Sequence, residues 1–508
     1  MSGDALGENR SEGFVGTCDS QVVEPPNELC DGAFLLCDVA LAITVSMLAC
    51  GSASALTLKE AVAVAVESNP EIGQAIENRE AIEFELRQAK GLYLPSVDLE
   101  ASTGVRRLDN DTRRALDQDH EALYPNEADL TVSQTLYDSG ARRAELNRQA
   151  SRVDGASFRV LERSEFIGLA VVQDYLEYML QASIVAEAKK NLGFHQSILS
   201  DIKQGIAGGA LNDADRQQAE ERLYAAKARM QEATEELEAA KIRFFKNVGK
   251  PLTNASRPGD VSAALPRSLD DAIGLARQNN PRVHMANSDI DSAASLVDAA
   301  RAKYGPTITA EGVARGGYDI DGDNGDASDL QARVVLRWNL YRGGIDKANE
   351  QEQIRRTSEQ RLALHQVLRE IEEAVRTSWD RRFRQAELAK TLRQQAATNE
   401  KLVASYREQF KVGQRSLLDV LDAQNTRFNT ATLADTSSYA SLFAEYRLLA
   451  ATGELLKTLN IQPAKQATAY AREEFGVPAT ADTETYARTP SEQKNDLPFD
   501  ILAPVRKK

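Results

Sequence analysis

The sequence predicts a mainly α-helical fold with a four-stranded β contribution, and three observations support this prediction. Among 508 residues there are only 30 glycines and 15 prolines, aromatic residues make up 6% and charged residues 27%. This composition is typical of long polar helices. Two long segments, 141–203 and 346–411, contain no proline, so each can form one continuous helix. Four shorter segments alternate apolar and polar residues, as half-buried strands do.

The charge balance and the motif content exclude several functional classes. Lys and Arg number 61 against 76 Asp and Glu, which gives a net charge of −15 and excludes a basic nucleic-acid groove. The histidines at 120, 195, 284 and 365 have no zinc-type spacing. No glycine-rich phosphate loop or serine nucleophile elbow occurs. We therefore expect no enzyme, no cofactor and no metal.

Residues 1–55 are interpreted as a leader segment. An apolar run at 39–49 precedes Ala53 and Ala55, whose spacing fits a signal-peptidase site. No Lys or Arg lies between Arg10 and Lys59, which is unusual for a signal peptide, so the true start codon stays open. Lipidation of Cys50 is an open alternative. This segment holds every cysteine of the chain: Cys18, Cys30, Cys37 and Cys50.

The rest of the chain contains two copies of one module. Residues 58–70 align without gaps on 269–281, and the correspondence continues through the remaining segments of each copy. We expect a first repeat at 56–255 and a second at 256–462, each with helices, a β-hairpin and a long helix pair. The Ala/Thr/Glu-rich residues 463–508 are predicted to form a polar, disordered tail.

Each repeat is predicted to begin with two helices. An amphipathic segment stops at Asn69-Pro70 in the first repeat and at Asn280-Pro281 in the second. Proline at the first helical position can start the next helix. These second helices are expected to end near Lys90 and Lys303.

Four alternating segments follow as two hairpins. Their apolar positions are Val97, Leu99 and Ala101, then Leu130, Val132, Gln134 and Leu136, then Ile308 and Ala310, and finally Val334, Leu336, Trp338 and Leu340. The pattern fits a membrane barrel wall with a wet lumen, and it equally fits a soluble antiparallel sheet. Four strands cannot close a membrane barrel alone, since about eight is the smallest size. In a membrane, several copies would have to pool their strands.

The two proline-free segments are predicted to be helices of roughly 90 to 100 Å at 1.5 Å per residue. In the first of them, one stripe follows coiled-coil spacing. Other apolar residues, such as Phe158, Leu161 and Leu169, lie off that stripe. A helix that is apolar on several sides has several neighbours, as in a wall of helices. An ordinary long helical hairpin is the open alternative.

At this point the layout resembles the TolC-type outer-membrane efflux and secretion channel family over about residues 56–462. The resemblance depends on the duplicated Asn-Pro, on Leu-Tyr-x-x-Gly at 136–140 and 340–344, and on residues 413–423. It is closest to members that serve type I secretion. It implies a homotrimer that shares a transmembrane β-barrel in outer-membrane lipid, continued through the periplasm by a long coiled-coil α-helical barrel.

The function implied by this resemblance is a passive exit duct across the outer membrane and periplasm. Its expected partners are a periplasmic adaptor, or membrane fusion protein, and an inner-membrane ABC or proton-driven transporter that supplies energy. A soluble periplasmic coiled-coil scaffold is the alternative. The sequence determines neither the cargo nor which transporter and adaptor are used.

The resemblance also implies a periplasmic gate, at Arg415, Asp419 and Asp422, with Asp215 at the position equivalent to Asp419. The two acids Asp419 and Asp422 are three residues apart, so they share one helical face. Acids that ring an axis would favour cations and repel one another. Arg415 would restrain that repulsion.

The turns before these acids, at Gly209 and Gly413, are the expected contacts for the adaptor. The acids have a second possible role, because Ser416 with Asp419, and Asn212 with Asp215, have the spacing of helix-capping pairs. Many relatives place a tyrosine at the position of Phe410, so the bonding of the gate is expected to differ here.

Residues 319–326 partly match a calcium-binding loop. Its first, third and fifth acids fit, but Asn324 replaces the glycine and Leu330 replaces the final glutamate. A solvated outer loop between two strands is the preferred interpretation, and calcium binding there stays open.

Overall fold

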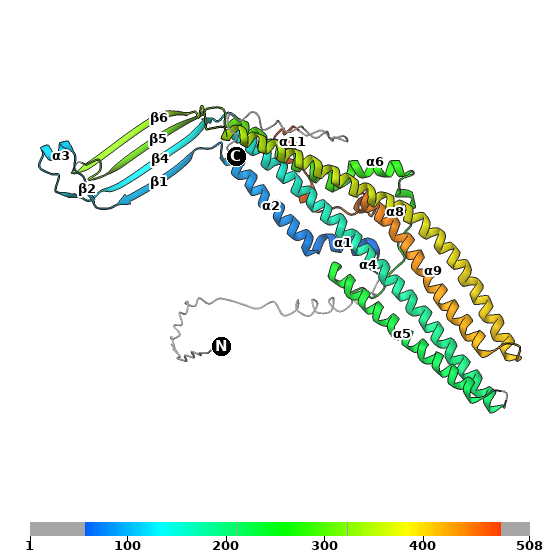
Figure 1. The fold of residues 1–508 in the computed structure, drawn as a ribbon. Coiled ribbons are helices and arrows are strands. Elements are labelled where there is room, and N and C mark those ends of the chain that lie inside the picture. The colour runs from blue at the N-terminus through cyan, green and yellow to red at the C-terminus, as the bar shows by residue number, and fades with distance from the viewer. Residues whose placement is uncertain (1–55, 210, 323, 479–508) are drawn as a thin grey trace, which may run out of the picture. The chain divides into compact units, whose positions relative to one another are not determined.

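The computed structural model describes residues 56–209, 211–322 and 324–478. The chain divides into two units, Met1–Ser54 and Ala55–Lys508, and the second is described here (Figure 1). The predicted leader, the Cys50 alternative and residues 479–508 of the predicted tail lie outside the described residues.

The two copies contain the same major elements in the same order. The first has α1 (Leu58–Ser68), α2 (Pro70–Gly91), β1 (Ser96–Thr103), β4 (Asn126–Tyr137), α4 (Ala141–Ala207) and α5 (Asp213–Val248). The second has α6 (Leu269–Asn279), α7 (Pro281–Ala302), β5 (Thr307–Tyr318), β6 (Asp326–Arg337), α8 (Ile345–Lys411) and α9 (Leu417–Ala451). The long helices α4 and α8 have 67 residues each, so both predicted rods are confirmed.

Smaller elements that the sequence did not predict complete the fold. They are β2 (Arg106–Arg107), α3 (Asp111–Ala115), β3 (Ala122–Leu123), η1 (Ser262–Ala264), α10 (Leu455–Thr458), η2 (Lys465–Ala467) and α11 (Ala471–Glu474). The first three lie in the loop between β1 and β4.

The Asn-Pro pairs start α2 and α7 and also fasten them. The Asn69 side chain accepts a hydrogen bond from the backbone of Glu71, and its amide donates to the carbonyl of Asn247 at 2.9 Å. In the second copy Asn280 caps α7 in the same way and donates to the carbonyl of Ala451 at 2.9 Å. Each asparagine therefore satisfies a helix start and a helix end together.

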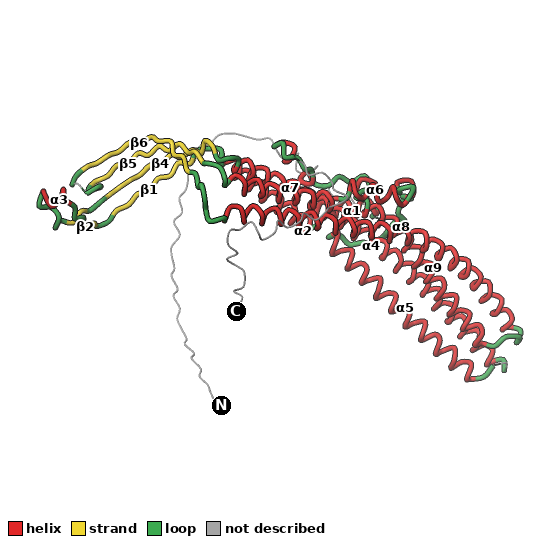
Figure 2. The backbone as a smooth tube through the Cα atoms, turned by 45° about the horizontal axis from the view of Figure 1, so that its top comes forward, coloured by secondary structure: helices red, strands yellow, loops and turns green. Residues whose placement is uncertain are grey.

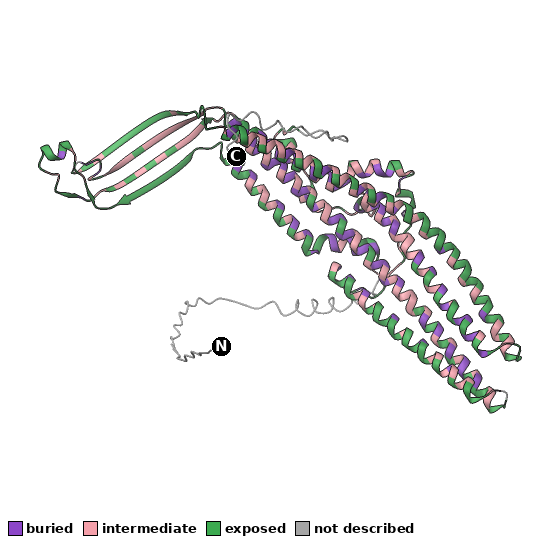
Figure 3. Ribbon diagram, in the orientation of Figure 1, coloured by how far each residue is buried: buried purple, intermediate pink, exposed green. Residues whose placement is uncertain are grey.

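Helix α4 has neighbours on several sides, as its apolar pattern predicted. It contacts α2, α5, α7 and α9, and Figure 2 shows the helices side by side. The stripe with coiled-coil spacing consists of Leu146, Ala150, Val153, Ser157, Val160, Ser164, Ile167, Val171, Asp174 and Tyr178, and all of these except Asp174 are buried. Figure 3 shows buried positions recurring along the long helices. None of the described helices is both long and apolar enough to cross a lipid bilayer.

The largest core forms where α1, α5, α9 and α10 meet the middle of α4. Its largest members include Tyr175, Phe244 and Tyr446, all almost fully buried. The Tyr175 hydroxyl lies 2.8 Å from the carbonyl oxygen of Leu56 and 2.7 Å from that of Ser256, so this polar atom stays hydrogen-bonded inside the core.

The four long strands form one antiparallel sheet in the order β1-β4-β5-β6. The predicted alternation is correct through Thr135; beyond it a β-bulge places Tyr137, and not Leu136, opposite Ile308 of β5. The alternation is wrong for Trp338 and Leu340, since β6 ends at Arg337 and both residues follow the strand.

The prediction of a disordered tail is wrong for residues 463–478, because these residues pack on the helices. The backbone amides of Tyr470, Ala471 and Arg472 all donate to the buried carboxylate of Asp154 on α4. The Arg472 guanidinium also donates to Asp154, at 3.0 Å, and to Asp291 on α7, at 2.6 Å. This C-terminal strap therefore joins helices from both copies. The prediction failed because the segment has few apolar residues, and the polar contacts that hold it cannot be recognised from composition.

Candidate functional site

Two equivalent turns form the tip of the helical hairpins, away from the sheet. Gly209 follows α4 with φ +77°, and Gly413 follows α8 with φ +74°. This left-handed conformation is easy only for glycine and ends a helix sharply. The predicted adaptor-contact glycines thus occupy matching turns between the long helices and their partners.

An apolar cluster just behind the turns joins the two hairpins. It is buried between α4, α5 and α9, and its members are Ile198, Leu199, Ile202, Ala219, Leu417, Val420 and Leu421. Because α4 and α9 belong to different hairpins, this cluster holds the hairpins together at their tips.

The structure brings Arg415 and Asp419 together, but within a single hairpin. The guanidinium lies 3.8 Å from the Asp419 carboxylate, donates to the side-chain oxygen of Gln409 at 3.2 Å, and covers the ring of Tyr406 at 4.3 Å. Gln409 and Tyr406 are on α8, so Arg415 ties the end of α8 to the start of α9. The ring in contact with Arg415 is that of Tyr406, four residues before Phe410.

Asp422 makes a contact between hairpins. Its carboxylate lies 3.7 Å from the guanidinium of Arg222 on α5. The side chains of Asp422 and Asp419 are 60% and 44% exposed, so both acids are accessible to solvent at the tip. Sequence reasoning missed Arg222, because its position opposite Asp422 depends on the packing of α5.

Asp215 is placed as a helix cap. Its side chain accepts a bond from the backbone of Asn212 at 3.1 Å, while the Asn212 side chain accepts from the Asp215 backbone at 3.1 Å. Ser416 likewise accepts from the backbone of Asp419 at 3.2 Å. The capping roles are therefore present, and the gate role of Asp215 stays a prediction.

Arg407 forms a further link between hairpins that the sequence did not reveal. From α8 its guanidinium donates to the Asp201 carboxylate at 2.9 Å and to the Ser197 hydroxyl at 2.7 Å, both on α4. The partners are more than 200 residues apart in the chain, so no local pattern pairs them.

Two more polar links join α9 to α4 above the apolar cluster. Arg427 lies 3.3 Å from Glu187, and both side chains are only 14% exposed. Gln424 donates to the side-chain oxygen of Asn191 at 2.8 Å in a buried position. Charge-assisted bonds in such a poorly hydrated seam are strong and directional, so they favour one docked position of the hairpins.

His195 on α4 is buried in the same region, with 5% of its surface exposed. Burial, with a smaller contribution from the charge of Arg222, lowers the pKa of His195 to about 4. Among the described residues its Nδ1 has no hydrogen-bond partner. The packed tip therefore holds this imidazole in its neutral form.

The packing at the tip is expected to loosen as the pH falls from about 6.5 towards 4. An exposed His195 takes up a proton near pH 6.5, whereas the packed one does not, so acid stabilises the open form relative to the packed form. Backbone hydrogen exchange around residues 190–205, corrected for intrinsic rates, should rise at pH 5 relative to pH 7.5. His195→Phe should abolish this difference. The exposed His120→Gln variant should retain it, and an equal pH response in His195→Phe would refute the explanation.

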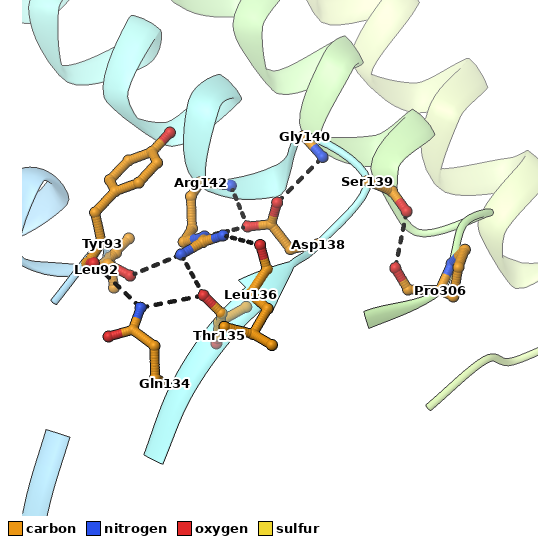
Figure 4. A network of polar contacts seen from close by, with 10 residues as sticks. All are labelled: Leu92, Tyr93, Gln134, Thr135, Leu136, Asp138, Ser139, Gly140, Arg142 and Pro306. Atoms are coloured by element: carbon orange, nitrogen blue, oxygen red, sulfur yellow. Dashed lines mark hydrogen bonds and ion pairs between the residues drawn. The ribbon is translucent and has the colours of Figure 1, made fainter. Parts of the chain in front are cut away.

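The Leu-Tyr-x-x-Gly motif builds the junction between sheet and helix (Figure 4). In the first copy the Arg142 guanidinium donates to the carbonyls of Thr135 at 2.8 Å and Leu136 at 3.4 Å, and to the Asp138 carboxylate at 2.8 Å. It also lies over the ring of Tyr93 at 4.8 Å. The Arg142 guanidinium thus donates hydrogen bonds to carbonyl groups that have lost their strand partners where β4 ends and α4 begins.

The second copy repeats this pair with the charges exchanged. Arg342 and Asp346 stand where the first copy has Asp138 and Arg142, and their side chains lie 3.6 Å apart. In both copies the preceding glycine, Gly140 or Gly344, has a positive φ. The motif therefore sets a backbone turn and an ion pair, whichever residue carries the positive charge.

The loop at 319–326 holds a cation supplied by the chain itself. Arg113, 2% exposed, extends from the β1–β4 loop and donates to the Gly322 carbonyl at 2.7 Å and to the Asn324 side chain at 3.3 Å. Asp319 accepts bonds from the backbone of Gly325 at 3.0 Å and Tyr124 at 3.3 Å. These hydrogen bonds join the loop between β1 and β4 to the loop between β5 and β6.

Comparisons with known proteins agree with this geometry. The family model described as outer membrane efflux protein matches residues 61–250 and 272–454. The chain is 27% identical over 296 residues to the outer membrane efflux protein BepC of Brucella suis, an alignment covering 56% of this chain and 62% of BepC. It is 23% identical over 451 residues to the proteases secretion protein PrtF of Dickeya chrysanthemi, covering 85% and 94% of the two chains.

The fold is shared with solved outer-membrane channels. The Campylobacter jejuni CmeC outer membrane channel superposes with a TM-score of 0.70 at 16% identity, over 82% of this chain and 89% of that one. The similarity to BepC, in contrast, spans about three fifths of that relative.

Proposed function

Since the chain belongs to the outer membrane efflux protein family, we propose that it is the outer-membrane exit duct of a tripartite machine for type I protein secretion or efflux. The duct is passive and carries out no catalysis. An inner-membrane ABC or proton-driven transporter supplies the energy, and a periplasmic adaptor joins it to the tip turns at Gly209 and Gly413. The relationship to the proteases secretion protein PrtF supports the secretion branch.

The membrane part of this proposal is a β-barrel shared by a homotrimer. The sheet has two free edges, on β1 and β6. Successive strands are antiparallel, so β6 of one copy can continue the ladder onto β1 of the next with the same alternation. Closure removes edges that lipid cannot satisfy. Three copies of four strands exceed the minimum of about eight.

The apolar face of the sheet is the observation that carries this proposal. Val97, Leu99 and Val334 are 63%, 73% and 68% exposed, and Leu330 is 85% exposed. A soluble scaffold would leave this contiguous apolar surface in water, which monomeric soluble proteins rarely do. In the outer membrane, lipid chains would cover this apolar band, so that it would not be exposed to water.

The helical tip forms the periplasmic gate. Asp419 and Asp422 of three copies would place six carboxylates around one axis, with Asp215 contributing from the first repeat. Arg415 holds Asp419, and Arg222 holds Asp422, at distances of 3.8 and 3.7 Å. Release of these contacts leaves acids that repel one another, which favours opening once the adaptor engages.

Removing both acids should reduce cation selectivity. We expect Asp419→Ala with Asp422→Ala to move the reversal potential of the reconstituted channel, measured across a salt gradient, towards zero. The matched control removes two exposed acids of α8 that lie away from the tip turns, Glu352→Ala with Asp380→Ala, which pair with Arg356 and Arg384 of the same helix. Unchanged selectivity in the tip variant would remove these acids from the aperture. Channels absent from both variants and wild type would refute the duct itself.

A further inference from the structure

We propose that the free edges of the sheet carry an ionic key that sets how neighbouring copies join. In this key Arg333 on β6 of one copy pairs with Glu100 on β1 of the next copy. Asp98 of that next copy lies between Arg333 and Arg337. The inference rests on the proposed function, in which identical copies pool their strands, and it specifies their register.

The four charged residues share one face of the sheet. Residues directly opposite in an antiparallel ladder point to the same side. The register of the sheet places Glu100 opposite Asp129, Asp129 opposite Arg315 and Arg315 opposite Asp329, while Glu311 lies opposite Arg333. Ion pairs of Arg315 with Glu127 and Asp129, and of Arg333 with Glu311, confirm that these side chains extend to a common face.

The charges at the two free edges are complementary and incompletely matched within one copy. On β6, Arg333 and Arg337 share the single carboxylate of Glu311, at 2.8 and 3.2 Å, and remain 50% and 65% exposed. On β1, Asp98 accepts only a bond from the Ser96 hydroxyl at 3.2 Å. In the part of the chain that the structure describes, neither Asp98 nor Glu100 has an ion pair. The end of β6 that holds Arg333 and Arg337 therefore carries surplus positive charge, while Asp326 and Asp329 lie nearer its other end, and β1 carries surplus negative charge.

If β6 of one copy paired with β1 of the next without any stagger, two acidic residues would lie directly opposite each other. The row through Asp129 and Arg315 runs from Glu100 on β1 to Asp329 on β6. Extended without stagger onto the next copy, it would bring Asp329 directly opposite Glu100. Glu100 already lies opposite Asp129 in its own copy, where Arg315 offsets the charge of Asp129; a second acid opposite Glu100 would add repulsion, because directly opposed like charges destabilise a strand pair.

The tilt of membrane strands requires a stagger instead. At about 35 to 45° of tilt, four strands about 4.8 Å apart accumulate a shift of about four to six residues, and the shift must be even to keep apolar residues on one face. A shift of six would leave Ser96 and Val97 opposite residues beyond the end of β6 at Arg337, so a shift of four is favoured. In one direction a shift of this size leaves half of β1 without a partner. In the other direction residues 330–337 of β6 lie opposite residues 96–103 of β1, so every residue of β1 is paired.

This second register satisfies both faces of the sheet. On the polar face Arg333 lies opposite Glu100, and Val335, between the two arginines, lies opposite Asp98. On the apolar face Val334 lies opposite Leu99, which continues the exposed apolar band across the boundary between copies. Charge, backbone pairing and the apolar band thus select the same alignment.

Cysteine cross-linking distinguishes the registers, because the sequence contains no cysteine after Cys50. Leu99→Cys with Val334→Cys is expected to give covalent oligomers on mild oxidation in outer membranes. Within one copy β4 and β5 separate these positions, so a disulfide must join two copies. The matched pair Leu99→Cys with Leu330→Cys reports the flush register and should stay uncrosslinked. Cross-linking of that pair instead, or of neither pair in an intact oligomer, would overturn the ionic key.

Charge exchange tests the key independently. Glu100→Arg and Arg333→Glu, each alone, should lower by several degrees the temperature at which the detergent-solubilised oligomer dissociates. The double variant should recover part of the loss, because Arg333→Glu also removes the pair with Glu311 inside its own copy, and its dissociation temperature should lie above that of Arg333→Glu alone. Equal effects without recovery would overturn the pairing while leaving the proposed duct intact. A wild-type protein that is monomeric in detergent and in membranes would instead refute the proposed function.

Discussion

Replacing Asp154 with alanine is expected to lower the free energy of unfolding by about 3–5 kcal/mol, as the loss of one partner from a buried ion pair does. The Asp154 side chain is only 4% exposed and accepts bonds from three backbone amides and from the Arg472 guanidinium. Without it, these donors stay buried and unpaired. Arg472 would keep only Asp291 on α7, so the strap would lose its attachment to α4.

The melting temperature of the solubilised protein and protease cleavage after residue 463 measure this effect. Asp298→Ala is the matched control, because Asp298 is an acid on α7 that is 64% exposed and pairs with Arg301 at 3.7 Å. Such exposed pairs contribute about 1 kcal/mol or less. Equal stability of the Asp154 and Asp298 variants would show that the strap does not hold the repeats.

Replacing Arg407 and Arg427 together with alanine is expected to raise single-channel conductance severalfold. These two arginines join the α8–α9 hairpin to α4, through Asp201 and Glu187. Loss of Arg427 leaves the poorly exposed Glu187 with only Lys190 of its own helix, at 2.6 Å, and removes its tie to α9, so separated hairpins gain stability relative to docked ones. Arg415→Ser should add to the rise, because it frees the start of α9 from Tyr406 and Gln409.

Planar-bilayer recordings of each variant provide the measurement. The control is Arg384→Ala, an arginine on α8 that is 72% exposed and whose ion pair among the described residues is with Asp380 of the same helix. It should conduct as the wild type does. Wild-type conductance in the Arg407 and Arg427 variant would assign these links to folding and not to the gate.

Local and repeated patterns made most of the fold predictable from the sequence. The duplicated Asn-Pro pairs placed the starts of α2 and α7, and the proline-free runs placed α4 and α8. Period-two alternation found the four long strands. These signals are local because backbone geometry alone fixes the periods of 3.6 and 2 residues.

The contacts across the chain could not be predicted, because their partners are far apart in sequence. Asp154 and Arg472 are separated by 318 residues, and Glu187 and Arg427 by 240. The same holds at the tip, where the sequence predicted Arg415, Asp419 and Asp422. It did not predict that Arg415 stays within its own hairpin while Asp422 contacts Arg222. A charged residue in a polar sequence gives no sign of which helix it will face.

The central claim is that identical copies complete one channel, and the mass of the native assembly tests it most directly. Protein extracted from outer membranes in mild detergent, and weighed by light scattering with the detergent subtracted, should have the mass of three chains and should fall to one on boiling. A protein recovered from the water-soluble fraction at the mass of one chain would contradict the account.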